Sequence, residues 1–170
     1  MQPVLHTDRL HLAPLRPGDA DELHVVWGDP EVIWWGHRPT LDDTRQLVTD
    51  LLGRSPFAPD GTGWWLLRGR STGDVIGDVV LQPVPRPGGE IEVGWHLARN
   101  HWGGGYATEA ARRILDHAFE TLGLDAVVAD IALQNTRSIA VAERLGMERR
   151  PDPIARNGLL HGVWETAPLR

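Results

Sequence analysis

The chain has 170 residues, with 23 acidic side chains against 17 basic ones and a net charge of −6. This balance excludes a nucleic-acid binder, because binding to a phosphate backbone needs clustered cations, and it suits a neutral or cationic partner. There is no cysteine, which excludes a disulfide scaffold and a thiolate zinc site, and we expect no metal.

No apolar run approaches the ~20 residues of a membrane span. The first ten residues, MQPVLHTDRL, lack the basic and then apolar segments of a signal peptide, so we expect a cytoplasmic protein with no membrane partner. The length fits one ordinary domain, and an apolar content of 41% predicts a packed core. We therefore expect a single domain over residues 1–170.

The N-terminal half predicts one strand, two helices and a hairpin. Asp19 stands where it can cap the first helix, and Thr40 with Asp43 resembles a capping box at the start of the second. A compact turn at residues 71–73 separates the two strands of the hairpin. In chain order the elements are a strand at 9–15, helices at 20–27 and 40–52, and strands at 64–70 and 74–82.

The C-terminal half alternates strands with helices. In residues 90–97 the odd-numbered positions are apolar and face one way, while Glu92 and His96 face the other. From Tyr106 the apolar period becomes helical, and it ends at Gly123. Further elements are a strand at 126–133, a helix at 136–145 and strands near 147–149 and 161–166. This order predicts an α/β fold with a mixed central sheet of about seven strands flanked by about four helices.

Three consecutive glycines, Gly103, Gly104 and Gly105, stand between a predicted strand and a predicted helix in the string HWGGGYATEA. The first N–H groups of a helix have no partner within it and the dipole is positive there, so a turn without side chains lets an anion approach closely. The pattern predicts a phosphate or pyrophosphate site. A Walker A loop is excluded because the chain has no lysine, and a dinucleotide fingerprint fits poorly because Thr108 stands at its last glycine position.

Several motifs, in the right order along nearly the whole chain, resemble the GNAT family of N-acetyltransferases. TDRLHLAPLR (7–16) is similar to the opening of its RimJ/RimL-like members, which acetylate the N-termini of ribosomal proteins. EIEVGWHLARNHWGGGYATEAARRILDHAF (90–119) resembles the family's central strand, pyrophosphate loop and helix, and NTRSIAVAERLGM (135–147) resembles its next signature. The resemblance implies the GNAT fold, acetyl-coenzyme A as cosubstrate, and acetyl transfer to a primary amine by direct attack in a ternary complex.

The resemblance also implies which residues bind acetyl-coenzyme A. The pantetheine arm would lie along the end of the central strand, where the Leu97 amide could polarise the thioester carbonyl, and Asn135 would hydrogen-bond an amide of the arm. Backbone N–H groups of the glycine loop and the first helical turn would hold the pyrophosphate. The implied binding residues are Trp95, His96, Leu97, Trp102, Gly103, Gly104, Gly105, Tyr106, Ala107, Thr108, Asn135 and Ser138.

Acetyl transfer to an amine needs a proton acceptor for the amine and benefits from a proton donor for the departing thiolate. Glu92 is the candidate catalytic base, because the resemblance places a glutamate just before the Gly-aromatic pair of the central strand. Glu90, His96 and an ordered water are the alternatives. Ser138 is the candidate catalytic donor to the sulfur, since Ala142 stands where many relatives carry a tyrosine as general acid.

The acceptor is expected to be an amine, either a protein N-terminus or a small molecule. We expect its site between the first two helices, residues 34–39 and the turn near 86–89, where carboxylates would attract a cation. The resemblance also implies that the chain can pair as a homodimer. The alternative to an enzyme is a non-catalytic acyl-coenzyme A-binding module that acts as a sensor or partner subunit. The carboxylates that favour an amine acceptor are Asp42, Asp43, Asp78, Glu90 and Glu92.

Overall fold

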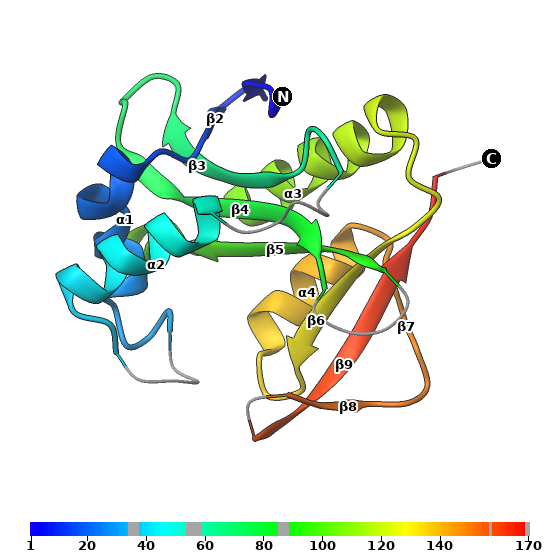
Figure 1. The fold of residues 1–170 in the computed structure, drawn as a ribbon. Helices are drawn as coiled ribbons and strands as arrows, with labels where there is room; N and C mark the ends of the chain where they lie inside the picture. The colour runs from blue at the N-terminus through cyan, green and yellow to red at the C-terminus, as the bar shows by residue number, and fades with distance from the viewer. Residues whose placement is uncertain (34–37, 54–58, 85–88, 157, 169–170) are drawn as a thin grey trace.

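A nine-stranded sheet forms the centre of the molecule in the computed structural model, which describes residues 1–33, 38–53, 59–84, 89–156 and 158–168 (Figure 1). Across the sheet the order is β1-β2-β3-β4-β5-β6-β9-β7, and β8 pairs with β9. The helices are α1 (Ala20–Trp27), α2 (Leu41–Gly53), α3 (Tyr106–Asp116) and α4 (Thr136–Arg144). The strands are β1 (Leu5–His6), β2 (Leu10–Pro14), β3 (Gly63–Gly69), β4 (Val75–Pro83), β5 (Ile91–Leu97), β6 (Val127–Ala132), β7 (Glu148–Arg149), β8 (Ile154–Arg156) and β9 (Leu159–Thr166).

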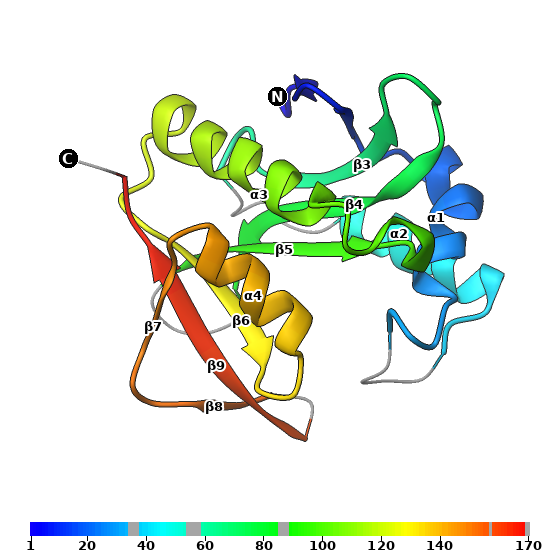
Figure 2. The ribbon, with the colours of Figure 1, turned by 180° about the vertical axis from the view of Figure 1, so that it is seen from behind.

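Helices cover both faces of the sheet. α1 and α2 lie on the face turned to the viewer in Figure 1, whereas α3 and α4 lie on the opposite face, seen in Figure 2. The predicted alternation of β5 is confirmed: Val93 and Leu97 are buried in the core that α3 and α4 cover, while His96 lies beside Trp27 of α1. β5 therefore offers apolar side chains to one pair of helices and polar ones to the other.

The sheet opens between β5 and β6. Every other pair of neighbouring strands among the described residues is antiparallel, whereas β5 and β6 run parallel and pair at one position, Glu92 opposite Val128. Beyond that position the two strands diverge toward their C-terminal ends (Figure 1). The connections from β5 to α3 and from β6 to α4 both start at this open end, so the topology brings two helix N-termini there.

The predicted class, a mixed α/β sheet with four helices, is confirmed, and two strands add to the seven expected. β1 and β8 have two and three residues, too few to show a periodic pattern. The expected cap of the first helix is wrong: the Asp19 carboxylate instead accepts a hydrogen bond from the backbone N–H of Arg16 at 2.8 Å, within a 3-10 turn. No helix in the described ranges is long and apolar enough to cross a membrane.

Candidate active site

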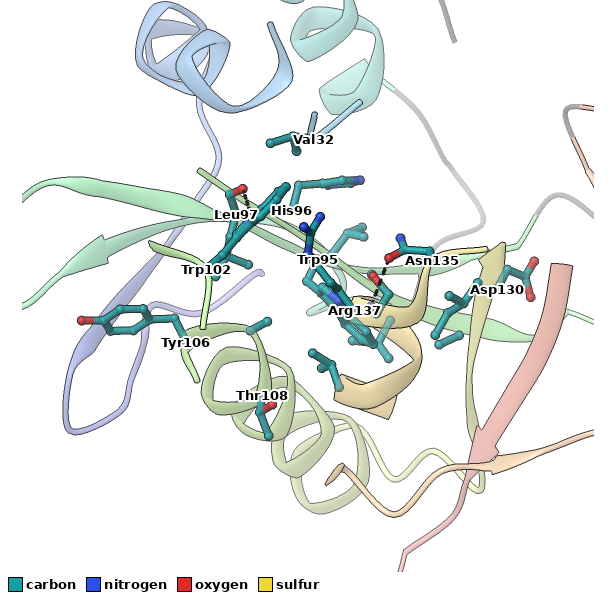
Figure 3. Close-up of a pocket in the computed structure, with 18 of the residues that line it drawn as sticks. Val32, Trp95, His96, Leu97, Trp102, Tyr106, Thr108, Asp130, Asn135 and Arg137 are labelled. Carbon is teal, nitrogen blue, oxygen red and sulfur yellow. Dashed lines mark hydrogen bonds between the residues drawn. The ribbon is translucent and has the colours of Figure 1, made fainter. Parts of the chain in front are cut away.

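A cavity of about 1320 Å³ occupies the opening between β5 and β6. Both strands line it, together with the loop before α3, the first turns of α3 and α4, and parts of α1, α2 and β3. A pocket for one drug-sized ligand measures about 300–1,000 Å³, so this cavity has room for two ligands. Figure 3 shows the residues gathered around it. All the residues predicted from the sequence as catalytic or coenzyme-binding line the cavity except Gly104.

The three glycines before α3 are required for two different reasons. Gly103 and Gly105 have φ angles of +77° and +79°, in the left-handed region that other residues rarely adopt. At Gly104 a Cβ would lie 3.0 Å from the ring of Tyr106. Gly105 is also the N-cap of α3, and it provides no side-chain cap. The positive end of α3 therefore carries no capping side chain at this position.

Arg9, just before β2, braces the glycine loop from outside the cavity. Its Nη1 donates to the carbonyl of Gly104 at 2.9 Å, and its Nε donates to Glu109 of α3 at 2.6 Å. Its guanidinium also lies 4.3 Å from the centre of the Tyr106 ring. Burial alone would raise the pKa of Glu109, but hydrogen bonds from Thr7 and Arg9 lower it, so this carboxylate stays ionised and keeps the brace together. The motif at residues 7–16 thus helps to hold the glycine loop in place.

The backbone groups of β5 alternate between its two neighbours. A hydrogen bond from Ala98 N–H to the Ile76 carbonyl, at 3.0 Å, continues the β4–β5 ladder, whose register has no shift. By the alternation of an antiparallel ladder, the even-numbered residues of β5 bond to β4, and His96 is among them. The N–H and C=O groups of Trp95 and Leu97 therefore point toward β6, on the side where the sheet opens.

The second junction, from β6 to α4, has a side-chain cap. The Oδ1 of Asn135 accepts a hydrogen bond from Ser138 N–H at 3.1 Å, which leaves the Nδ2 as the atom that could donate to a ligand. The guanidinium of Arg137, in the same turn, lies 4.3 Å from the centre of the Trp102 ring. The Nε1 of Trp102 donates to the Leu97 carbonyl at 2.9 Å, so the two junctions are tied to each other and to β5.

Glu92 lies on the α1/α2 side of the opening and is 8% exposed. Its Oε1 accepts a hydrogen bond from Gln82 Nε2 at 2.9 Å, and its Oε2 lies 3.2 Å from Arg156 Nη1. The same Nη1 of Arg156 contacts Asp130 Oδ2 at 3.0 Å. Both oxygens of Glu92 are thus engaged, and the carboxylate is held in one orientation. No pattern in the sequence pointed to Arg156, which lies 64 residues from Glu92 along the chain.

A second polar group lies on the same face of β5. Asp78 of β4, directly opposite His96, is fully buried and accepts hydrogen bonds from Trp27 Nε1 at 2.8 Å and from His96 Nδ1 at 3.0 Å. Burial alone would lower the pKa of His96, but the charge and hydrogen bond of Asp78, with a further contribution from Glu92, raise it above its usual value. The one signal of this pair in the sequence is an acid inside the apolar strand VIGDVVL.

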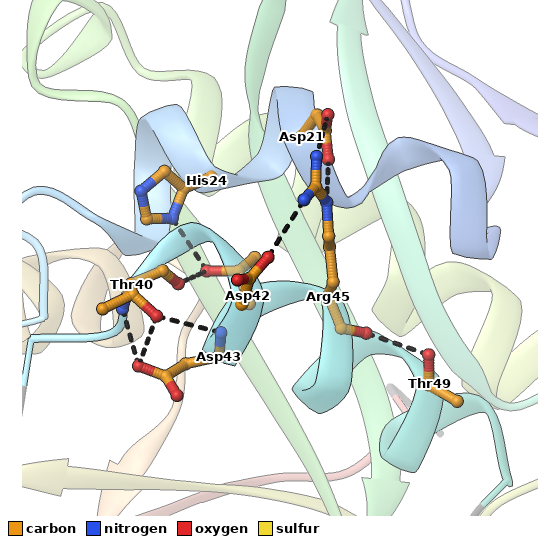
Figure 4. Close-up of polar contacts among 8 residues, drawn as sticks. Asp21, His24, Thr40, Asp42, Asp43, Arg45 and Thr49 are labelled. Atoms are coloured by element: carbon orange, nitrogen blue, oxygen red, sulfur yellow. Dashed lines mark hydrogen bonds and ion pairs between the residues drawn. The ribbon is translucent and has the colours of Figure 1, made fainter.

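The carboxylates expected at the mouth of the acceptor site have mostly other partners. Asp43 completes the predicted capping box of α2, and Asp42 pairs with Arg45 at 3.0 Å on the outer surface (Figure 4). Glu90 pairs with Arg150 at 2.6 Å. None of these three lines the cavity in the described structure, so the expected acidic mouth is wrong for them. The acidic residues that do line it are Glu31, Glu92, Glu109 and Asp130.

The segments predicted to border the acceptor are residues 34–39 and the turn near 86–89, and most of both, residues 34–37 and 86–88, lies outside the described residues. Val32 and Pro39, on either side of residues 34–37, line the cavity. In the ranges that are described, no three side chains of the metal-binding types come together as a possible ion site. The groups that the described residues offer for chemistry at the site are carboxylates, a histidine, a hydroxyl and backbone amides.

Comparison with known proteins shows to which family a chain with this open sheet and cavity belongs. The family model described as "Acetyltransferase (GNAT) domain" matches residues 9–148. The chain belongs to the GNAT acetyltransferase family, and it is an N-acetyltransferase. Members of this family use acetyl-coenzyme A as the acetyl donor.

The names of the relatives do not identify the acceptor of this chain. An uncharacterized N-acetyltransferase, p20, from Bacillus licheniformis is 30% identical over 86% of this chain and 83% of its own. The FsC-acetyl coenzyme A-N(2)-transacetylase of Aspergillus fumigatus is 35% identical over 86% of this chain, which spans 65% of that protein. A GnaT-family acetyltransferase from Bordetella pertussis superposes with a TM-score of 0.82 at 29% identity, covering 98% of this chain and 100% of its own.

The comparisons do not confirm the RimJ/RimL subtype, because its members match this chain in fold alone. The ribosomal acetyltransferase RimL, solved with coenzyme A, superposes with a TM-score of 0.77 at 15% identity, and covers 96% of this chain and 97% of its own. Spermidine N-acetyltransferase from Vibrio cholerae superposes almost as well, with a TM-score of 0.75 at 18% identity over 95% of this chain and 96% of its own. Two neighbours with different acceptors are equally distant, so neither identifies the acceptor of this chain.

Proposed function

We propose that the protein transfers an acetyl group from acetyl-coenzyme A to a primary amine, by direct attack in a ternary complex. The observation that carries this proposal is the cavity, which runs from the uncapped end of α3, through the opening between β5 and β6, to Glu92 and His96 on the other face of the sheet. Coenzyme and amine could enter from opposite faces and meet between the strands, so the fold itself would hold the two reactants in contact.

The coenzyme would occupy the α3/α4 side of the opening. Its pyrophosphate would bind backbone N–H groups from Gly103 to Thr108, at the positive end of α3; the Trp102 N–H, expected among them, donates instead to the Arg99 carbonyl at 3.1 Å. Its pantetheine arm would hydrogen-bond the backbone of Trp95 and Leu97, which faces the place that a further strand would fill. The Nδ2 of Asn135 would donate to an amide of the same arm. The backbone of His96 bonds to β4 and its side chain lies beside Trp27 on the other face of the sheet, so His96 would face the acceptor and not the coenzyme.

The reaction would use groups on both faces. Glu92 would take the proton from the ammonium form of the acceptor, directly or through an ordered water, with Gln82 and Arg156 fixing its carboxylate. The Leu97 N–H would polarise the thioester carbonyl and stabilise the oxyanion. The Ser138 hydroxyl would protonate the thiolate of coenzyme A as it leaves.

The acceptor that we propose first is the α-amine of a protein N-terminus, as in RimJ/RimL-like enzymes, and the second is a small-molecule amine. The apolar side chains on the α1/α2 side would contact the body of either acceptor; they include Trp27, Val32, Leu47, Leu51 and Trp64. Three expectations from the sequence stay predictions: one domain over residues 1–170, a cytoplasmic location and pairing as a homodimer.

A thiol-release assay tests the function. Because the chain has no cysteine, a thiol reagent added to the reaction reports only the coenzyme A that is set free. The panel contains peptides with a free N-terminal alanine or serine, spermidine, and α-amino acids. We expect turnover on at least one of these amines. Tight binding of acetyl-coenzyme A, measured by calorimetry, without turnover on any amine would contradict the proposal and support the non-catalytic module instead.

A further inference from the structure

Asp78 and His96 have the geometry of a histidine oriented by a carboxylate. An ionised carboxylate can only accept hydrogen bonds, so the contact of 3.0 Å requires His96 Nδ1 to carry the hydrogen. Trp27 fixes the other oxygen of Asp78 at 2.8 Å, and Asp78 itself is fully buried. The carboxylate therefore has a single orientation, and in the neutral imidazole it assigns the lone pair to Nε2.

The ring of His96 is placed by aromatic neighbours as well. It stacks on Trp64 with planes 3° apart and centres 6.2 Å apart, and Trp27 meets it edge-on at 6.4 Å. Nδ1 points toward β4, where Asp78 lies, so Nε2 lies on the far edge of the ring. His96 lines the cavity, and about 20% of its side chain is exposed there.

Gly94 separates His96 from Glu92 on this face of β5. Because side chains on a strand alternate, Glu92, Gly94 and His96 point the same way, and the middle one has no side chain. Opposite them on β4 stand Gln82, Val80 and Asp78 in the same order. A Cβ at Gly94 would lie 3.0 Å from Cγ1 of Val80. The methyl group of Val80 therefore takes the place of a side chain at Gly94, and both residues line the cavity between Glu92 and His96. This stretch of the cavity wall is flanked by two proton acceptors, each oriented by its partner on β4.

We propose that the acceptor nitrogen binds over Gly94 and that His96, held by Asp78, is a catalytic base for one of the two protons that this nitrogen loses. The inference rests on the acetyl transfer proposed above. His96 is a catalytic residue in this scheme, because it would touch the reacting nitrogen, and Asp78 is a positioning residue.

The proton balance requires a second acceptor. An ammonium gives up one proton, to Glu92, before it can attack. The C–N bond then forms, the carbonyl electrons move to oxygen, and the nitrogen becomes positively charged with a proton to lose, which His96 Nε2 accepts. The oxyanion electrons return, the C–S bond breaks, and the thiolate takes a proton from Ser138. Ser138 regains its proton through water from one of the two protonated bases. The nitrogen has then lost two protons and the sulfur has gained one, so the remaining proton reaches the solvent.

The charged surroundings of His96 set the expected pH dependence. Asp78 on β4 and Glu92 on β5 are the carboxylates that raise its pKa. Trp27 of α1 and Trp64 of β3 pack against the imidazole ring, and neither side chain ionises. Glu31 and Arg156 line the same cavity farther away. Since His96 accepts a proton only when neutral, turnover should fall as the pH drops through a pKa above the usual value of imidazole.

The test compares kcat–pH profiles of the wild type, His96→Gln and Asp78→Asn with the fastest amine of the panel. Glutamine keeps a donor toward Asp78 but titrates nowhere, so kcat should fall by about 10²-fold and the limb due to His96 should vanish. Asparagine can present an amide N–H to Nδ1, which moves the ring hydrogen to Nε2, so kcat should fall at every pH. It also removes the charge, so the limb that remains should shift to lower pH. His6→Gln, at an exposed position of β1, is the matched control and should behave as the wild type.

Binding and unfolding measurements keep the inference separate from the proposed function. Calorimetry with acetyl-coenzyme A and thermal unfolding of each variant should match the wild type, which excludes misfolding as the cause of lost turnover. If the wild type turns over the amine but His96→Gln keeps kcat within about threefold, or keeps the same acid limb, the assignment of His96 is overturned. A change confined to KM would overturn it too. Absence of wild-type turnover on every amine would instead overturn the proposed function, and this inference with it.

Discussion

The two junctions at the open end of the sheet differ in how their helices begin. At the start of α4 Asn135 caps the helix, with its Oδ1 bound to Ser138 N–H. At the start of α3 the N-cap is Gly105, in a left-handed conformation and without a side-chain cap. A capping residue stabilises a helix by about 1 kcal/mol. The start of α4 has this stabilisation, whereas the three-glycine turn before α3 lacks it.

The difference indicates that the two helix ends have separate tasks. The protein satisfies the first turn of α4 by itself, and an oriented amide and hydroxyl then line the cavity. At α3 no side chain caps the positive end, which under the proposed function would bind the pyrophosphate, and Arg9 donates a hydrogen bond to the Gly104 carbonyl of the loop. Substitutions at the α3 junction should therefore change coenzyme binding. Substitutions at the α4 junction should change stability and the rate of the reaction.

The largest effect is expected from Gly105→Asp. A carboxylate here would cap α3 and repel the pyrophosphate, and two charges ~4 Å apart interact by about 4 kcal/mol at an effective dielectric of ~20. We expect the Kd for acetyl-coenzyme A, measured by calorimetry, to rise by at least about 10²-fold. Gly105→Asn is the matched control, because it has the same shape, tolerates a left-handed backbone and carries no charge. Equal affinities of the two variants would show that no anion binds there.

A large effect of another kind is expected at the closed end, where β5 and β6 still pair. Glu92→Gln keeps the shape but removes the base, so kcat should fall by about 10²-fold, and most at low pH, where the amine is hardest to deprotonate. Arg156 retains Asp130 as a partner, which limits the structural damage. Glu90→Gln, two residues earlier on the same face, is the control and should change kcat little. A constant ratio of mutant to wild-type rates across pH would remove Glu92 as the base.

Ser138→Ala separates the hydroxyl from the cap. Asn135 binds the backbone N–H of residue 138, so alanine leaves the cap of α4 intact. We expect kcat to fall by about tenfold, at the mild end of acid catalysis because a thiolate is a fair leaving group, with an unchanged Kd for acetyl-coenzyme A. The measurement is steady-state thiol release combined with calorimetry. A Kd that weakens in step with kcat would assign Ser138 to coenzyme binding alone.

The sequence predicts what is local and misses what depends on register across strands. The order of the main elements, the capping box at Thr40 and the bare turn before α3 all follow from short patterns. The dual role of the glycines, conformational at Gly103 and Gly105 and steric at Gly104, appears only once the Tyr106 ring has a place. The pairing of His96 with Asp78 depends on how β4 and β5 align, and no periodicity within one strand encodes that alignment.

The smallest expected effects come from Asn135, and two variants divide its roles. Asn135→Ala removes both cap and donor, so the free energy of unfolding should fall by about 1 kcal/mol and the Kd for acetyl-coenzyme A should rise by about fivefold. Asn135→Asp keeps an oxygen that can cap α4 but loses the Nδ2 donor, so chemical denaturation should show wild-type stability while calorimetry shows weaker binding. If the aspartate variant binds acetyl-coenzyme A as tightly as the wild type, Asn135 only caps α4. The contrast between the junctions would then be complete, because β5 would contact the pantetheine arm, the α3 end would contact the pyrophosphate, and the α4 junction would not bind the coenzyme through Asn135.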